Sequence, residues 1–231
     1  MKNLHELFEK YGINLSKEQE NQFDKYFSML VETNKVMNLT AITEENEVLV
    51  KHFLDSAIPE KLIKSNSNIV DVGSGAGFPA LPLKIVRPDL EICMVDSLNK
   101  RINFLNEVIS ELNLARISAI HARAEDFAKT NREKFDVAVA RAVAPLNTLV
   151  EYLLPLVRVG GQAIIYKSAK LDEELSKSAT AIKIFGAQVE KIENFTLEND
   201  IERNILVLKK TKPTPKQFPR SKNLPKTKPI Q

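Results

Sequence analysis

The stretch IVDVGSGAGFPALPL, residues 69–83, places three glycines and two prolines between two apolar runs. Glycines let the backbone turn sharply and let a ligand lie directly against it. Pro79 and Pro82 are tolerated only in the first turn of a helix, where the N–H groups have no intrahelical partners. The stretch therefore predicts a strand over residues 68–72, a glycine-rich turn and a helix that begins close to Pro79.

Outward from this stretch, short apolar runs alternate with amphipathic helices. The runs are NIVDV (68–72), EICMVD (91–96), RISAIHA (116–122), FDVAVA (135–140) and GGQAIIYK (160–167). Strands that alternate with helices predict a parallel sheet that is covered on both faces. Two later runs, 187–197 and 203–210, have no helix between them and predict an antiparallel pair. We therefore expect an α/β fold with a seven-stranded, mostly parallel sheet and one antiparallel edge strand.

The predicted helices before and inside the sheet follow the spacing of apolar residues. One apolar stripe comprises Leu98, Ile102, Leu105, Ile109 and Leu112, and another comprises Phe23, Phe27 and Leu30. Thr43 can cap a second N-terminal helix. We expect three parts: a small helical N-terminal region (1–64), a sheet domain (65–210) and a basic, proline-rich tail (211–231).

Charge is distributed unevenly along the 231 residues. The net charge is +3, yet eight basic and no acidic residues lie between Lys209 and Gln231. An acidic body with a basic tail indicates contact with a polyanion, most simply a nucleic acid, although a solvated tail has the same composition. The single cysteine, Cys93, excludes an internal disulfide and is read as a core residue. With no apolar run long enough for a membrane span and a charged N-terminus, we expect a cytoplasmic protein.

Two acidic residues indicate which ligand the glycine-rich turn binds. Asp71 precedes the first glycine, where a carboxylate would repel a pyrophosphate and suits the ammonium and sulfonium of S-adenosylmethionine. Asp96 ends the second strand, where it can accept hydrogen bonds from both ribose hydroxyls. The alternative for Asp71 is a capping or turn carboxylate. No cluster of side chains has metal-ligand spacing, so we expect no metal site.

A series of motifs covers nearly the whole chain. They are NLTAI (38–42), KHFLDS (51–56), DVGSGAGFPALPL (71–83), VDSLNKRINFL (95–105), ARAEDF (122–127), ARAVAPL (140–146), YKS (166–168) and FPRSKNLPKTKP (218–229). In this order they resemble the RsmG (GidB) family of bacterial 16S rRNA (guanine-N7) methyltransferases. The resemblance implies a class I methyltransferase-like, Rossmann-like fold.

The resemblance also implies a reaction. The expected enzyme transfers a methyl group from S-adenosylmethionine to N7 of a guanine in 16S rRNA, and its partner is that RNA, the small ribosomal subunit or its precursor. Guanine N7 has a lone pair and no proton, so the transfer needs positioning and electrostatics but no general base. ARAVAP stands where methyltransferases of exocyclic amines carry Asn/Asp-Pro-Pro-aromatic. We expect a monomer.

Site residues follow from the resemblance, position by position. The expected cofactor-binding set is Asp71, Gly73, Gly75, Gly77, Phe78, Asp96, Ala124, Glu125 and Arg141. Arg141 and Lys167 are the expected catalytic residues, although Ser168 stands where the family usually has glycine. The expected RNA-binding set is Arg123, Lys167, Arg220, Lys222, Lys226 and Lys228.

Three other residues have two interpretations each. His52 and Asp55, three positions apart on one helical face, either pack against the rim of the cofactor site or serve as ordinary capping or core residues. Phe218 either stacks on an unpaired base or anchors the tail to the protein.

Three alternative functions remain at this point. An NAD-dependent oxidoreductase is disfavoured by Asp71 and by the absence of a recognisable catalytic pair. A methyltransferase that acts on a small molecule or a protein is disfavoured by the basic tail. A catalytically silent RNA-binding protein is disfavoured by the intact glycines and by Asp71 and Asp96.

Overall fold

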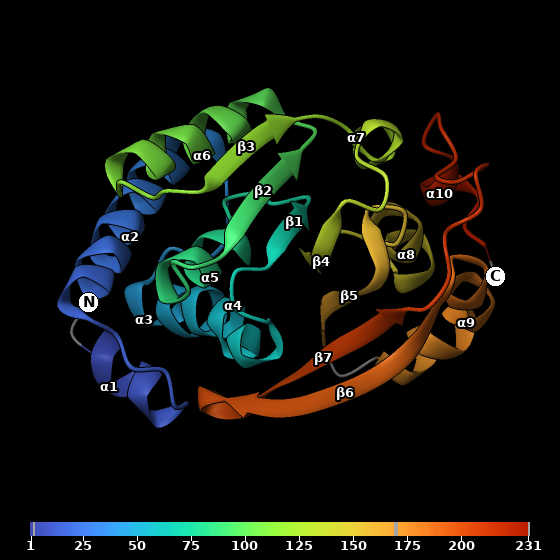
Figure 1. Cartoon of the computed structure of the whole chain (residues 1–231). Helices are drawn as coiled ribbons and strands as arrows, with labels where there is room; N and C mark the ends of the chain where they lie inside the picture. Colours follow the sequence, from blue (N-terminus) through green and yellow to red (C-terminus); the bar gives the residue numbers. More distant parts are fainter. Residues whose placement is uncertain (2, 169–170, 231) are drawn as a thin grey trace.

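A seven-stranded sheet runs through the molecule, and helices cover both of its faces (Figure 1). The computed structural model describes residues 1, 3–168 and 171–230, and within them the strand order is β3-β2-β1-β4-β5-β7-β6. The order reverses between β1 and β4, the kind of switch point where open α/β sheets bind ligands. The strands are β1 (Asn68–Val72), β2 (Glu91–Asp96), β3 (Ile117–His121), β4 (Phe135–Arg141), β5 (Val157–Lys167), β6 (Ala187–Leu197) and β7 (Ile201–Lys210).

The predicted antiparallel pair is confirmed at one end of the sheet. β7 runs antiparallel to both β5 and β6, so β6 is the outermost strand and points the same way as β1 to β5. The reversed strand thus lies one place in from the edge. Because β7 is paired on both sides, its central residues 205–208 are buried, whereas most of β6 is exposed. The expected seven-stranded, mostly parallel α/β fold is confirmed.

Each face of the sheet has its own hydrophobic core. One core joins the sheet to the N-terminal helices and to α5 (Ala80–Val86) and α6 (Asn99–Glu111). The other joins it to α7 (Ala124–Thr130), α8 (Leu146–Leu153) and α9 (Leu171–Ile184). Leu98 departs from the predicted apolar stripe because it precedes the first turn of α6, where 42% of it is exposed. Among the described residues, no helix is long and apolar enough to cross a membrane.

The N-terminal region consists of helices, as predicted. They are α1 (Leu4–Lys10), α2 (Lys17–Met37), α3 (Glu45–Val48), the π-helix η1 (Leu49–Leu54), α4 (Asp55–Ala57) and the 3-10 helix η2 (Ile58–Leu62). Ser16 and Gln19 form a capping box at the start of α2. The prediction that Thr43 caps the next helix is wrong. Glu44 is the cap, and its carboxylate accepts a 2.8 Å hydrogen bond from the amide of Glu47.

The glycine-rich turn ends where the prolines indicated. Pro79 occupies the cap position of α5, which begins at Ala80, and Pro82 lies in its first turn. The turn therefore starts a buried helix directly beside the carboxyl end of β1. Near the chain's other end, the short helix α10 (Leu224–Thr227) lies against α8 (Figure 1).

Candidate active site

A cleft of about 420 Å³ lies beyond the carboxyl ends of the strands at the switch point of the sheet. Residues that follow β1 and β4 line one end of it, and residues that follow β2 and β3 line the other. The predicted cofactor residues that line the cleft are Gly73, Asp96, Ala124 and Glu125, and they are joined by Arg123 and Lys226 from the predicted RNA-binding set.

Asp96 is the best-connected acid of the cleft. Its Oδ2 accepts hydrogen bonds from the amide of Gly75 at 2.9 Å and from the guanidinium of Arg101 at 3.2 Å. Its Oδ1 accepts one from the amide of Leu98 at 2.9 Å. A carboxylate has about four acceptor positions, so one remains for a ribose hydroxyl. A second hydroxyl would have to replace one of the present donors, and Arg101, on a partly exposed side chain, is the easiest to displace.

The glycine-rich turn has different requirements at each glycine. Gly73, Gly75 and Gly77 all have positive φ angles, of 75°, 59° and 106°. A Cβ atom on Gly77 would lie 2.3 Å from the Leu81 side chain, so this glycine is required by packing. A Cβ atom on Gly75 would have only the Gly73 carbonyl near it, at 3.9 Å. The open space is therefore at Gly75, where a ligand can approach the backbone.

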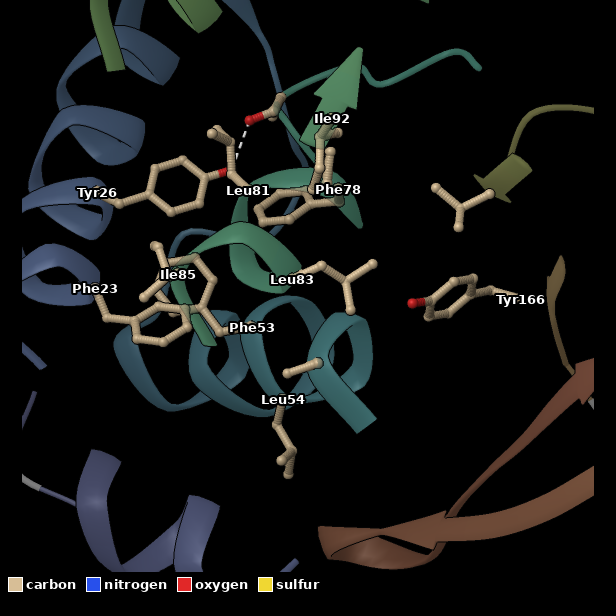
Figure 2. Close-up of a cluster of buried hydrophobic side chains, with 14 of the residues drawn as sticks. Phe23, Tyr26, Phe53, Leu54, Phe78, Leu81, Leu83, Ile85, Ile92 and Tyr166 are labelled. Atoms are coloured by element: carbon tan, nitrogen blue, oxygen red, sulfur yellow. Dashed lines mark hydrogen bonds between the residues drawn. The ribbon is translucent and has the colours of Figure 1, made fainter. Parts of the chain in front are cut away.

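An aromatic cluster from the N-terminal region supports this turn from below (Figure 2). Tyr26 is buried and its ring stacks on Phe53, with centroids 5.0 Å apart. Its hydroxyl donates a 2.6 Å hydrogen bond to the carbonyl of Ala76 in the turn. The helical region and the glycine-rich turn are thus held together directly.

Asp71 lies beneath the turn and does not line the cleft. It is fully buried, and neither carboxylate oxygen has a hydrogen-bond partner among the described residues. Burial raises the pKa of Asp71 to about 8. A buried carboxylate without a partner is costly unless something pairs with it, so the residue fits a site for a ligand that carries positive charge.

Arg141, at the end of β4, is held by the π-helix η1 and by the first residue of α4. Its Nη1 donates to the carbonyl of Lys51 at 2.8 Å and to Asp55 at 2.9 Å, and its Nη2 lies 3.1 Å from Nδ1 of His52. The guanidinium also lies 4.8 Å from the centroid of the Phe78 ring. A guanidinium has five N–H groups, so two remain without a partner in this arrangement.

His52 and Asp55 therefore both contact Arg141, and neither lines the cleft. The His52 ring stacks on Phe78 with centroids 4.5 Å apart. Burial, and after it the positive charge of Arg141, lowers the pKa of His52 to about 4, so its imidazole is neutral at pH 7. Asp55 also accepts a 3.2 Å hydrogen bond from Arg203 and so lies between two arginines. Phe78 thus contacts both an imidazole and a guanidinium, and it is not among the residues that line the cleft.

Lys167 is tied to the loop that follows β4. Its Nζ donates to Glu174 at 2.6 Å and to the carbonyl of Ala144 at 3.1 Å. The same oxygen of Glu174 accepts a 2.7 Å hydrogen bond from the amide of Leu146. This arrangement fixes the loop between β4 and α8, and the expected contact of Lys167 with RNA stays a prediction.

The C-terminal tail is packed against the second core. Arg220 donates to both carboxylate oxygens of the fully buried Glu151, at distances down to 2.6 Å. Phe218 lies edge-on to Phe185, with centroids 4.8 Å apart, which corresponds to the anchoring interpretation. The Arg220 guanidinium is therefore engaged within the protein, which argues against its predicted contact with RNA. Lys222, Lys226 and Lys228 are exposed.

Sequence reasoning did not find several residues of the cleft, among them three with large or polar side chains. Arg101, Tyr152 and Asn223 line it, from α6, α8 and the tail. Only Arg101 had a local signal, because it follows Asp96 by little more than one helical turn; Tyr152 and Asn223 reach the cleft through tertiary packing alone. Across the described residues, no group of three or more His, Cys, Asp or Glu side chains is placed to hold a metal ion.

The fold and the switch-point cleft define a protein of the class I methyltransferase type. Pyrococcus horikoshii TYW2 in complex with MeSAdo has the same fold, with a TM-score of 0.55, 18% identity, and 68% of this chain and 61% of that chain covered. TYW2 from M. jannaschii, in complex with AdoMet, gives a TM-score of 0.52 at 14% identity, with 68% of this chain and 73% of that chain covered. At 14–18% sequence identity, the similarity to these two structures establishes the fold and nothing about the reaction.

Sequence relatives identify the family within that class. The family model described as rRNA small subunit methyltransferase G (GidB) matches residues 19–206. The ribosomal RNA small subunit methyltransferase G of Limosilactobacillus reuteri is 52% identical over 96% of this chain and 95% of its own length. The ribosomal RNA small subunit methyltransferase G of Staphylococcus epidermidis is 46% identical over 98% of this chain and 97% of its own length. The chain belongs to the rRNA small subunit methyltransferase G family.

Proposed function

We propose that this protein transfers a methyl group from S-adenosylmethionine to N7 of a guanine in 16S rRNA. The observation that carries the proposal is Asp71, a buried carboxylate beneath the glycine-rich turn at the switch point, whose oxygens have no hydrogen-bond partner in the part of the chain that the structure describes. Membership of the methyltransferase G family supports the RNA substrate. The expected setting is the cytoplasm, where a monomer would act on the RNA, the small subunit or its precursor.

The chain offers a group for each part of the cofactor. Gly73 and Gly75 would face the methionine portion, and the positive charge of the ligand would favour the ionised form of Asp71, which is protonated at neutral pH in the unliganded protein. Asp96 would accept a ribose hydroxyl, and Ala124 and Glu125 would lie beside the base. When bound, the cofactor supplies a methyl group activated by its sulfonium. The protein's part is to orient that group and to exclude water around it.

The acceptor nitrogen needs no general base, because guanine N7 presents a lone pair. Arg141 has two N–H groups left, and we propose that they donate to an acceptor atom of the incoming base and so orient it for the transfer. Lys167 would act by fixing the loop between β4 and α8 through Glu174. The neutral His52 would hold the Arg141 guanidinium in place.

The RNA would be held by exposed cations around the cleft. Arg123 and Lys226 line it, and Lys222 lines the hollow next to it. Each phosphate that these side chains neutralise should lower the logarithm of RNA affinity by ~0.7 per tenfold rise in salt. We propose that residues 65–210 form the methyl-transferring unit, with 1–64 supporting the glycine-rich turn and 211–231 adding cations.

The test is transfer of a labelled methyl group from S-adenosylmethionine to RNA. Protein-free 16S rRNA and small subunits that lack the modification are the two substrates, and the labelled base is then mapped. Label at a single guanine N7 supports the proposal. Cofactor binding without label on either substrate would refute the RNA substrate, and label on an exocyclic amine would refute the N7 assignment.

A further inference from the structure

The C-terminal tail reaches the cleft and is held there at two points. On one side of residues 221–224, Arg220 is paired with the buried Glu151. On the other side, the buried Thr148 hydroxyl donates a 3.0 Å hydrogen bond to the carbonyl of Pro225. Both anchors lie on α8, and the tail can be followed beside it in Figure 1. The segment between them is therefore fixed against the body of the protein.

Asn223 lies in this fixed segment and faces one particular end of the cleft. It lines the cleft together with Asp96, Arg123 and Glu125. It also shares the neighbouring hollow with Arg123 and Glu125. If Asp96 accepts a ribose hydroxyl and Gly73 faces the methionine portion, the base must extend from Asp96 toward β3. Asn223 therefore stands at the adenine end.

The chemistry of Asn223 suits an adenine edge. A side-chain amide offers one donor and one acceptor side by side, which complements the amino group and the adjacent ring nitrogen of adenine. Among the hydrogen bonds of the described residues, none uses this amide; only the Asn223 backbone carbonyl is engaged, by Lys226 and Thr227. Its φ of 60° is left-handed, a conformation that asparagine tolerates better than most residues.

We propose that residues 221–226 form a wall of the cofactor cleft and that the Asn223 amide reads the adenine edge of the cofactor. The inference rests on the proposed function, because it assumes that the cleft holds an adenosyl group. It assigns the tail a second task beside RNA binding. Removing the Asn223 side chain should then change cofactor specificity without any RNA present.

The experiment is calorimetric titration of the full chain with S-adenosylhomocysteine and with S-inosylhomocysteine, in which oxygen replaces the adenine amino group. Asn223→Gly removes the side-chain amide, and glycine adopts the φ of 60° found at this position without strain. Asn223→Asp keeps the size but leaves only acceptors. Asn113→Gly is the matched control. The backbone of Asn113 is also left-handed, with a φ of 51°, and the residue follows the end of α6 and does not line the cleft.

The wild type should prefer the adenosyl compound, and Asn223→Gly should reduce that preference roughly tenfold, as loss of a bidentate amide contact does. Asn223→Asp still accepts a hydrogen bond from the adenine amino group but no longer donates to N7, so it should weaken the binding of S-adenosylhomocysteine and keep the preference for the adenosyl compound. Asn113→Gly should keep the wild-type preference. An unchanged preference in Asn223→Gly would overturn the inference while leaving the proposed function intact. A wild type that binds neither compound would overturn the proposed function and this inference with it.

Discussion

The Tyr26 hydroxyl donates a 2.6 Å hydrogen bond to the carbonyl of Ala76, a residue 50 positions later in the chain. It is a buried contact between a helix of the N-terminal region and the glycine-rich turn (Figure 2). The N-terminal helices therefore set the position of the turn that we propose to bind the cofactor.

Tyr26→Phe should cost about 1–2 kcal/mol of unfolding free energy, because the Ala76 carbonyl is left buried without its donor. Cofactor affinity should fall several-fold as the turn loses its support. Denaturant unfolding and calorimetry measure the two effects. Tyr11→Phe is the matched control, since its hydroxyl also donates to a carbonyl, at 3.2 Å, but in an exposed setting. Equal effects of both changes would contradict a specific role for Tyr26.

Gly77→Ala should mainly reduce the stability of the protein, whereas Gly75→Ala should mainly reduce its affinity for the cofactor. Alanine at Gly77 meets Leu81 and the Tyr26 hydroxyl, so the loss of unfolding free energy should reach about 3 kcal/mol. Alanine at Gly75 enters open space, and only the left-handed backbone costs about 1 kcal/mol. Its methyl group would occupy the approach of the ligand, so cofactor affinity should be lost in a folded protein. Melting curves with ligand titration distinguish the two outcomes; a Gly75→Ala variant that binds normally would rule out close approach there.

Asp71 should make stability depend on pH. Its folded pKa, about 8, lies above the ordinary value of 3.8, so between about pH 4 and 8 the folded protein holds a proton that the unfolded chain has lost. The free energy of unfolding should therefore fall as pH rises through this window, by about 1.4 kcal/mol per unit at most. Asp71→Asn should flatten this slope and weaken cofactor binding. If the unfolding free energies of the wild type and Asp71→Asn change with pH in the same way between pH 5 and 8, Asp71 is not the group that titrates.

The two ends of the tail should respond differently to loss of a cation. Arg220→Ala leaves Glu151 buried and unpaired, which should cost about 3 kcal/mol of unfolding free energy. Lys228 is exposed, so Lys228→Ala should leave the unfolding free energy unchanged. It should make the slope of log RNA affinity against log salt concentration shallower by ~0.7, the contribution of one phosphate contact. Denaturant unfolding and RNA titrations at several salt concentrations test the pair. An unchanged salt dependence would remove Lys228 from the RNA-binding set.

The sheet was predictable because its signals are local. The runs 68–72, 91–96 and 187–197 coincide with β1, β2 and β6, since short runs rich in β-branched and aromatic residues between turn residues are typical of strands. The glycine-rich turn and the start of α5 were predictable for the same reason. The Glu44 cap was missed by one residue because threonine and glutamate side chains can both accept from the first free amides of a helix.

The surroundings of the site could not be predicted, because they depend on residues far apart in the chain. Arg141 meets its partners on η1 and α4 across 86 to 90 positions, and Arg220 meets Glu151 across 69. From the sequence, Arg220 was one more cation in a basic tail, and nothing local distinguished it from Lys222. Its buried partner decides its role. The same packing carries Asn223 to the cleft.

The reversed direction of β7 has a consequence for where the functional unit ends. Lys210 pairs with the start of β6 and leaves the sheet at the end opposite the cleft, so residues 211–223 must run back along its whole height to reach the site. A chain cut after β7 would retain every strand and the entire glycine-rich turn, yet its cleft would lack a wall. The matched family region stops earlier still, at residue 206. The last strand of the sheet and the last residue that lines the cleft are therefore separated by 16 positions, from Lys210 to Lys226.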